Sequence, residues 1–316
     1  MKKTTRILLM LFCILNAMTL TAQQKKVYLF SYFKNNGQDG LHLAYSTDGL
    51  KWLALNNDSS FLKPMVGKDR LMRDPSIVQD DKGVFHIVWT SGWWDKGIGY
   101  ASSTDLKHWS SQQNIPVMNS FSRARNAWAP ELFYDLKSKT FYIFWASTVP
   151  GMFPELPTSD SEKGLNHRLF YVTTKDFKTF SKTKVYFDGG FSAIDGTLLK
   201  RDNQYCLFIK NENSNPPEKN IRVVSSKKPY GFNPKTVSPP ITGNYWAEGP
   251  SPLQVGEYVY VYFDKYRDHR YGAVRSKDLV NWEDISDLIS FPAGTRHGTA
   301  FAVTEEEFGK MNLGGH

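Results

Sequence analysis

A short turn motif that recurs five times is the feature that most constrains how this chain folds. Each copy starts with a serine or threonine and ends with an aromatic residue, and four copies carry an aspartate at the third position. The copies lie at residues 46–52, 103–109, 174–180, 226–232 and 276–282, and the fourth lacks the acid. An aspartate here caps a turn while the aromatic packs beneath a neighbouring strand. The copies start 50 to 71 residues apart, which indicates a repeated unit of about 50 residues, the length of a four-stranded propeller blade.

Short runs of β-branched and aromatic residues recur once in each repeated unit. They lie at residues 27–30, 85–89, 141–145, 205–209 and 258–262, and glycine, asparagine, aspartate and lysine bound them. Such runs are typical of strands, and no amphipathic stretch of convincing helical length follows the N-terminal leader. We therefore predict an all-β, five-bladed β-propeller. Six imperfect blades or a jelly roll are weaker alternatives, because two independent series each count five.

The second series of five consists of segments that open each unit. They lie at residues 72–77, 128–132, 194–198, 247–251 and 296–300, and too little chain follows the last one to complete a blade. Strand-like residues 26–33 and 41–45 have no opening segment of their own. We expect the C-terminal segment to supply the inner strand of a shared blade and the N-terminal segment its outer strands. This closure leaves no free sheet edge between the first and last blades.

The first 23 residues resemble a secretory signal. Three basic residues precede an apolar stretch at 7–20, and residues 21–23 resemble a cleavage region. The apolar stretch is short for a membrane anchor, and Asn16 and Thr19 interrupt it. We expect export to the periplasm or the cell exterior, without stable membrane insertion after cleavage. Residues 24–316 then form a single catalytic domain.

Composition narrows the function classes of this domain. The net charge of +8 falls by three with the leader, and the remaining excess is spread without a basic run, which argues against nucleic-acid binding. Cys206 is the only cysteine after the leader, so a core and not a disulfide must stabilise the domain, which we expect to be a monomer. Aromatic residues make up 15% of the chain, and their flat faces with polar edges suit sugar rings.

The segments that open each unit contain the candidate catalytic residues. In a propeller the inner strands start at one end of the central channel, so these side chains are predicted to share one pocket: Asp74, Glu131, Asp195, Glu248 and His297. Converging carboxyls raise one another's pKa, and glycoside hydrolysis needs one carboxylic acid and one carboxylate on opposite sides of the sugar. Taken singly, each acid is equally well explained by a turn or a loop, and Glu131 is equally well explained by a structural role.

The ordered set Asp-Pro-Ser-Ile, Trp-Ala-Pro-Glu, Ala-Ile-Asp-Gly, Glu-Gly-Pro and Arg-His-Gly resembles the motifs of glycoside hydrolase family 43, a family of five-bladed propellers. The resemblance implies an inverting mechanism with Asp74 as general base, Glu248 as general acid and Asp195 tuning the acid's pKa. It places His297 near the channel axis, where some members hold a structural calcium, and it requires no cofactor. About 50 residues precede the Asp-Pro motif after the leader, which leaves Asp39 and Asp48 as alternative bases.

Aromatic and charged residues flank these motifs and are candidates to bind an oligo- or polysaccharide. The substrate-binding candidates are Trp93, Trp128, Glu131, Phe191, Trp246 and Arg296. Blade packing is the alternative for the aromatics, and neutralisation of the carboxyls is the alternative for Arg296. A long insertion at 148–167, rich in proline, glycine and serine, is a candidate wall that would enforce exo action.

These observations predict a secreted exo-acting α-L-arabinofuranosidase that acts on plant polysaccharide side chains. The choice of arabinose follows from the family resemblance and not from a particular residue. A β-xylosidase or endo-arabinanase of the same family is an alternative. Two further alternatives are a fructosidase-type hydrolase that retains the anomeric configuration and a carbohydrate-binding propeller that is not an enzyme.

Overall fold

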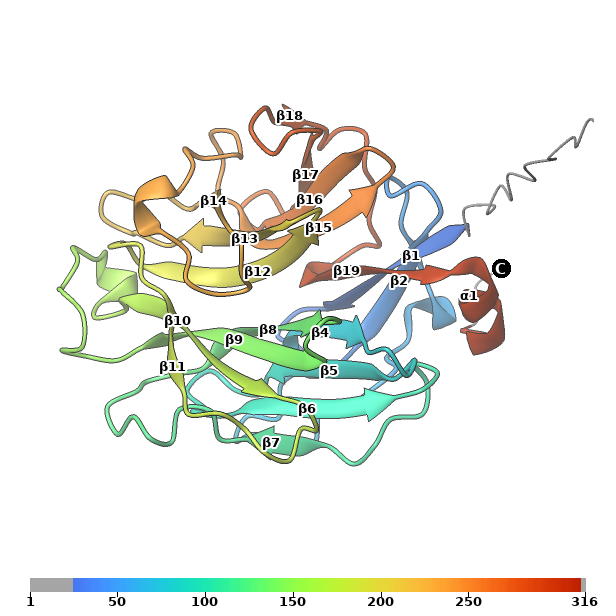
Figure 1. Ribbon diagram of the computed structural model, residues 1–316, viewed down its shortest axis with the longest axis horizontal. Coiled ribbons are helices and arrows are strands. Elements are labelled where there is room, and N and C mark those ends of the chain that lie inside the picture. Colours follow the sequence, from blue (N-terminus) through green and yellow to red (C-terminus); the bar gives the residue numbers. More distant parts are fainter. Residues whose placement is uncertain (1–24, 314–316) are drawn as a thin grey trace, which may run out of the picture.

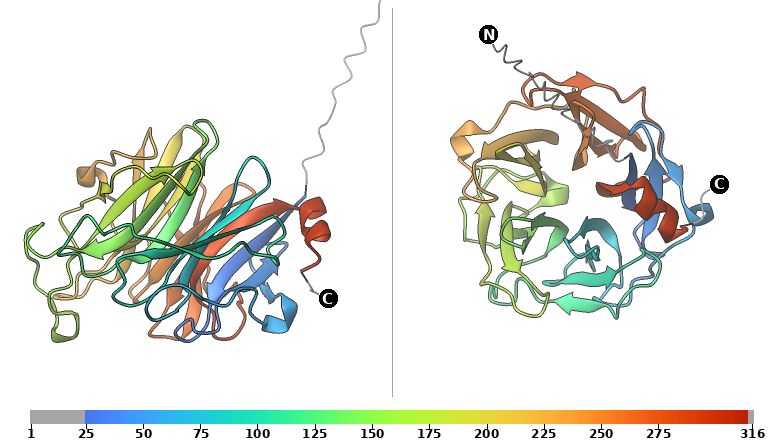
Figure 2. Two further views of the ribbon diagram at one scale, coloured as in Figure 1. Left: turned by 90° about the horizontal axis from the view of Figure 1, so that it is seen from below. Right: turned by 45° about the vertical axis from the view of Figure 1, so that its right-hand side comes forward.

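Five sheets arranged in a ring form the molecule (Figures 1 and 2). The computed structural model describes residues 25–313, so the predicted leader lies outside the described residues. The predictions of an all-β chain and of five blades are confirmed. The four-stranded expectation holds for four of the blades, whereas the sheet of β12, β13 and β14 has three strands.

Each blade is an antiparallel meander that starts at the central channel. Blade I contains β4 (Arg73–Gln79), β5 (Phe85–Thr90), β6 (Ile98–Ser103) and β7 (Gln113–Ile115). Blade II contains β8 (Trp128–Asp135), β9 (Thr140–Thr148), β10 (His167–Thr174) and β11 (Lys184–Phe187). Blade III contains β12 (Ala193–Arg201), β13 (Gln204–Asn211) and β14 (Asn220–Ser226). Blade IV contains β15 (Glu248–Val255), β16 (Tyr258–Lys265), β17 (Arg270–Ser276) and β18 (Glu283–Asp284).

Blade V joins the two ends of the chain. Its strands run in the order β19 (Arg296–Thr304), β1 (Lys26–Phe33), β2 (His42–Ser46) and β3 (Leu53–Ala54). The last strand of the chain is therefore the innermost strand of this blade, as predicted, and it pairs antiparallel with β1 from Lys26↔Thr304 to Phe33↔Arg296. The pairing closes the ring and carries residues 296–304 to the channel.

The recurrent turn motif closes the outer part of the blades by local hydrogen bonds. In the first copy Ser46 Oγ accepts a bond from the backbone N–H of Gly49 (2.9 Å), and Asp48 Oδ1 accepts from Leu50 (2.7 Å) and Lys51 (2.9 Å). Equivalent bonds occur in the copies that begin at residues 103, 174 and 276. The degenerate fourth copy keeps only the bonds made by its serine, because it has no aspartate.

The hydrophobic core is divided into five clusters, and each cluster fills the space between two adjacent blades. Side chains alternate along each strand and so face the two neighbouring blades in turn. On β9, for example, Ile143 and Trp145 pack toward blade I, whereas Phe144 and Ala146 pack toward blade III. The many aromatic residues are therefore mostly blade packing, which was the alternative considered for them.

One short helix, α1 (Glu305–Met311), follows β19 and was not expected from the sequence. Thr304 and Glu307 form a reciprocal capping box at its start, which satisfies N–H groups that the first turn leaves free. Three-residue 3₁₀ turns, η1 (Asn56–Asp58), η2 (Asp160–Glu162) and η3 (Pro234–Thr236), lie in loops. Within residues 25–313, no helix has the length and apolar character that crossing a membrane requires.

The ring closure leads to a first prediction. A Cβ atom on Gly298 would lie 1.7 Å from the carbonyl oxygen of Ser31, so Gly298→Ala must push β19 away from β1. We expect it to lower the free energy of unfolding by about 1–3 kcal/mol, the usual effect of overpacking. Urea unfolding monitored by tryptophan fluorescence measures the change.

Gly309→Ala is the matched control for this substitution. A Cβ atom there meets nothing within 4 Å, and alanine in a helix is favoured over glycine by about 0.5–1 kcal/mol. Equal stability of Gly298→Ala and the parent protein would contradict the close β19–β1 approach.

Candidate active site

A β-bulge at the same place on each inner strand shapes the mouth of the channel. On β4 the register shifts between Arg73 and Ser76, and the other inner strands shift at the equivalent positions. The bulged residue has a positive φ in four blades: 52° at Asp74, 46° at Ala129, 51° at Asp195 and 61° at Gly249. A bulge re-aims side chains, so consecutive residues of one strand can both contribute to the channel.

The strand registers arrange the channel residues in rings. The mouth ring consists of Arg73, Trp128, Ile194, Glu248 and Arg296. The middle ring consists of Asp74, Ala129, Asp195, Gly249 and His297, one residue further along each strand. The hydroxyl ring, two residues deeper again, consists of Ser76, Glu131, Thr197, Ser251 and Thr299. The four acids and His297 do not share one register: Glu248 lies one residue earlier than Asp74, and Glu131 lies two residues later.

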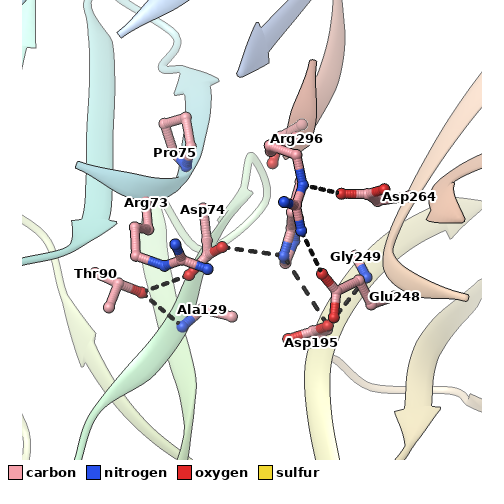
Figure 3. A network of polar contacts seen from close by, with 12 residues as sticks. Arg73, Asp74, Pro75, Thr90, Ala129, Asp195, Glu248, Gly249, Asp264 and Arg296 are labelled. Carbon is pink, nitrogen blue, oxygen red and sulfur yellow. Dashed lines mark hydrogen bonds and ion pairs between the residues drawn. The ribbon is translucent and has the colours of Figure 1, made fainter. Parts of the chain in front are cut away.

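Asp74 forms a buried ion pair with His297 in the middle ring, and Figure 3 shows its carboxyl beside Thr90, across from Asp195 and Glu248. His297 Nδ1 lies 3.3 Å from Asp74 Oδ1, and Thr90 Oγ1 donates to Asp74 Oδ2 at 2.8 Å. Burial favours the neutral acid, but the bond and charge of His297 outweigh it and lower the pKa of Asp74 to about 2. Burial likewise opposes the imidazolium, yet Asp195 and Asp74 raise the pKa of His297 to about 9. The low pKa of Asp74 favours its carboxylate form near neutral pH.

Asp195 approaches the same nitrogen of His297 as Asp74 does, with its Oδ2 atom 4.0 Å from Nδ1. Its Oδ2 accepts a hydrogen bond from the backbone N–H of Gly249 at 3.0 Å, which ties β12 to β15. Burial, together with the charges of Glu248 and Asp74, raises the pKa of Asp195 to about 6. Only glycine fits at 249, because its φ is +61° and a Cβ atom would lie 2.4 Å from the His297 ring.

Glu248 contacts two cations in the mouth ring. Lys210 Nζ donates to its Oε2 at 3.0 Å, and Arg296 Nη2 lies 3.5 Å from its Oε1. Burial alone would raise the pKa of Glu248, but Lys210, His297 and Arg296 lower it. The pKa of Asp195 is thus raised and that of Glu248 lowered, whereas the family resemblance implies that Glu248 is the residue that delivers the proton.

Three residues of the site were missed by the sequence analysis: Thr90, Lys210 and Asp264. Each lies on the second strand of its blade, directly opposite a mouth-ring residue, in the pairs Arg73↔Thr90, Ile194↔Lys210 and Glu248↔Asp264. Asp264 accepts from Arg296 Nε at 2.6 Å. The sequence contains a signal for them, since each is a polar residue near the end of an apolar strand run.

Glu131 does not line the mouth with the other acids. It lies in the hydroxyl ring, where it is 3% exposed and accepts hydrogen bonds from Ser76 (2.6 Å) and Thr299 (3.0 Å). Burial raises its pKa to about 7. The prediction that Glu131 binds substrate from the mouth is corrected: its two hydroxyl partners link blades I, II and V, which is the structural role considered as the alternative.

Trp93 and Trp128 lie together beside the site. Their rings meet edge to face with centroids 5.8 Å apart, and Trp128 Nε1 donates to the carbonyl of Trp93 at 2.6 Å. Trp93 is 40% exposed, and the guanidinium of Arg73 lies 4.4 Å from its ring centre. The structure thus forms an aromatic surface at the edge of the mouth ring, next to Asp74.

The remaining predicted sugar contacts have protein partners already. The guanidinium of Arg267 lies 4.3 Å from the ring centre of Trp246, and Phe191 packs on Phe187 with centroids 6.2 Å apart. Arg296 is held between Glu248 and Asp264. Its arrangement matches the alternative in which it neutralises the carboxyl cluster.

The residues around His297 do not fit the calcium ion suggested by the resemblance. Calcium takes six to eight oxygen ligands, whereas His297 carries its own positive charge between Asp74 and Asp195. Among the described residues, no group of three or more histidine, cysteine, aspartate or glutamate side chains is arranged to hold a metal ion. The imidazolium supplies the positive charge that the two carboxylates require.

Comparison with known proteins identifies the family of this chain. The family described as a probable glycosyl hydrolase domain, related to glycoside hydrolase family 43, matches residues 23–309. An α-L-arabinofuranosidase of Bifidobacterium longum subsp. longum is 29% identical over 190 residues, 57% of this chain and 16% of that protein. This chain therefore spans only a small part of the length of that curated relative.

Solved structures share the fold. An α-L-arabinofuranosidase from Lactobacillus brevis superposes with a TM-score of 0.53 at 15% identity, over 67% of this chain and 72% of that one. An exo-β-1,3-galactanase from Phanerochaete chrysosporium superposes with a TM-score of 0.51 at 12% identity, over 67% and 49%. Because the family match extends over nearly the whole described propeller, this chain belongs to the probable glycosyl hydrolase domains related to glycoside hydrolase family 43.

Proposed function

We propose that this protein is an exported, inverting, exo-acting α-L-arabinofuranosidase that acts on plant polysaccharide side chains. The observation that carries the proposal is that acids with separated pKa values meet around His297. Asp74, with a pKa of about 2, and Asp195, with a pKa of about 6, both face the Nδ1 atom of His297, and the charge of Glu248 acts on Asp195. Carboxyl groups with separated pKa values are what acid–base glycoside hydrolysis uses.

In the proposed reaction Asp74 accepts a proton from a water molecule that attacks the anomeric carbon. Glu248 gives its proton to the glycosidic oxygen as the bond from that oxygen to the anomeric carbon breaks. Asp195 tunes the pKa of Glu248. Its hydrogen bond from the Gly249 N–H holds β12 and β15 together. Thr90 and His297 fix both oxygens of Asp74, which orients the base.

The choice of arabinose is supported by the curated relative's name, and exo action is supported by the insertion at 148–167. Lys219 Nζ lies 2.6 Å from Glu162 Oε1, which fixes the η2 turn of the insertion to blade III. A cavity of about 390 Å³ lies within the insertion, lined by insertion residues such as Phe153 and Leu156 together with Arg125. We propose that the insertion, fixed in this way, forms a wall at one end of the sugar site.

Removal of either proposed catalytic carboxyl should slow hydrolysis strongly. We expect Asp74→Asn and Glu248→Gln to lower kcat on an aryl α-L-arabinofuranoside by about 10²–10⁴-fold, the range for loss of a general base or acid. Initial-rate kinetics measure the loss, and calorimetric titration with arabino-oligosaccharides should still detect binding.

Glu283→Gln is the matched control for these variants. Glu283 is an exposed acid on β18, paired with Arg275 at the outer edge of blade IV, and its loss should leave kcat unchanged. Wild-type protein that binds the sugar but hydrolyses none of the arabinofuranoside and xyloside substrates would favour the rival non-catalytic propeller.

The stereochemistry of the first product distinguishes the two hydrolytic mechanisms. An inverting enzyme uses acid and base about 6.5–9.5 Å apart with a water between them, whereas a retaining enzyme forms a covalent intermediate. We expect proton NMR of early time points to show β-L-arabinofuranose released from an α-linked substrate. Initial release of the α-anomer would support the fructosidase-type retaining mechanism instead.

A further inference from the structure

Lys210 is a buried cation that the proposed reaction does not use. It lies on β13, opposite Ile194 of the mouth ring, and its side chain is 1% exposed. Its Nζ lies 3.0 Å from Glu248 Oε2 and 2.7 Å from Glu212 Oε2, and 4.7 Å from the ring centre of Tyr266. Burying an ammonium is costly unless it is paired, so these two carboxylates are the reason it stays charged.

Glu212 divides its charge between two buried lysines. Its Oε2 faces Lys210, and its Oε1 lies 2.9 Å from Lys219 Nζ, which in turn contacts Glu162 of the η2 turn. Glu248 is therefore the end of a chain of alternating charges that starts in the insertion of blade II. Lys219 is as buried as Lys210, but its ion-pair partners are Glu212 and Glu162.

The other titratable groups around Glu248 come from four strands. Asp195 faces it from β12, Asp264 from β16, Tyr271 from β17, and Arg296 and His297 from β19. Tyr266 faces it from the turn after β16. Arg296 is shared with Asp264, at 2.6 Å against 3.5 Å to Glu248. Lys210 is therefore the nearest cation to Glu248.

We propose that Lys210 is a positioning residue that holds the Glu248 carboxyl in place and sets the pH above which Glu248 can no longer act as the acid. Glu212 weakens the ion pair between Lys210 and Glu248, because it binds the same ammonium. The proposal rests on the proposed function, in which Glu248 protonates the leaving oxygen. A nearby cation stabilises the carboxylate form, so Lys210 lowers the upper pH limit of activity. Glu212 competes for the same ammonium and so raises this pH limit again.

The test compares Lys210→Met with Lys219→Met and Glu212→Gln. Activity that needs a protonated Glu248 falls as pH rises through the pKa of that residue. Loss of the Lys210 charge should therefore move the alkaline limb of kcat/KM upward by about 1–3 pH units, the usual effect of one close opposite charge. Lys219→Met removes an equally buried ammonium that is not paired with Glu248; because it leaves Glu212 to Lys210 alone, it should move the limb upward by clearly less than Lys210→Met does. Glu212→Gln should move it downward.

A second readout does not depend on activity. Carbon-13 NMR of protein labelled at the glutamate carboxyl carbons follows the titration of Glu248, whose resonance is identified by its loss in Glu248→Gln. Its pKa should rise in Lys210→Met and fall in Glu212→Gln. If the Glu248 titration shifts as expected but no arabinofuranoside is hydrolysed, the proposed function is wrong, whereas the effect of Lys210 on the Glu248 carboxyl is confirmed.

An unchanged Glu248 titration in Lys210→Met, or equal shifts in Lys210→Met and Lys219→Met, would overturn the proposal. Thermal unfolding shows whether each variant is folded. Should Lys210→Met not fold, Glu212→Gln decides alone, and a pKa of Glu248 that stays constant or rises in that variant sinks the proposal.

Discussion

The antiparallel pairing of β19 with β1 is the constraint on which the site depends. It closes the ring of blades, and it also brings the last segment of the chain between blades I and IV. His297 and Arg296 reach the carboxyls of the other blades only through this closure. Without β19 the carboxyls of β4, β12 and β15 would face one another across an open edge, with two of their cations absent.

Electrostatic compensation explains how so many carboxyls are buried in one place. Three cations, Lys210, Arg296 and His297, lie among five carboxyls, Asp74, Asp195, Glu212, Glu248 and Asp264. Burial first, and neighbouring charge second, raises the pKa values of Asp195 and Asp264 to about 6. The pKa values of these carboxyls therefore differ from that of Asp74, which is lowered to about 2, and such a separation is what distinct acid and base roles use.

The backbone contributes as much to this arrangement as the charges do. Positive φ values at Asp74, Ala129, Asp195 and Gly249 place a bulge at the start of four inner strands. Such conformations are unfavourable for residues other than glycine, and they persist here because the neighbouring blades hold each strand in place. The bulges allow residues from two registers to meet at the mouth, so Glu248 and Asp195 become neighbours although their strand positions differ.

Local sequence patterns were sufficient to predict the blades, their number and the shared blade, because strand periodicity and turn chemistry depend on residues close together in the chain. They also identified Asp74, Asp195, Glu248 and His297, which the structure brings together. Register could not be predicted, since a bulge changes which face a residue occupies without changing the sequence pattern. Glu131 was therefore placed at the mouth, whereas it lies deeper, and Thr90, Lys210 and Asp264 were overlooked because only the folded sheet places second strands beside the channel. The sequence by itself determined which residues are the candidate catalytic groups. The tertiary structure decided which of them form ion pairs and which pKa values are raised or lowered, because a pKa depends on burial and on neighbours distant in the chain.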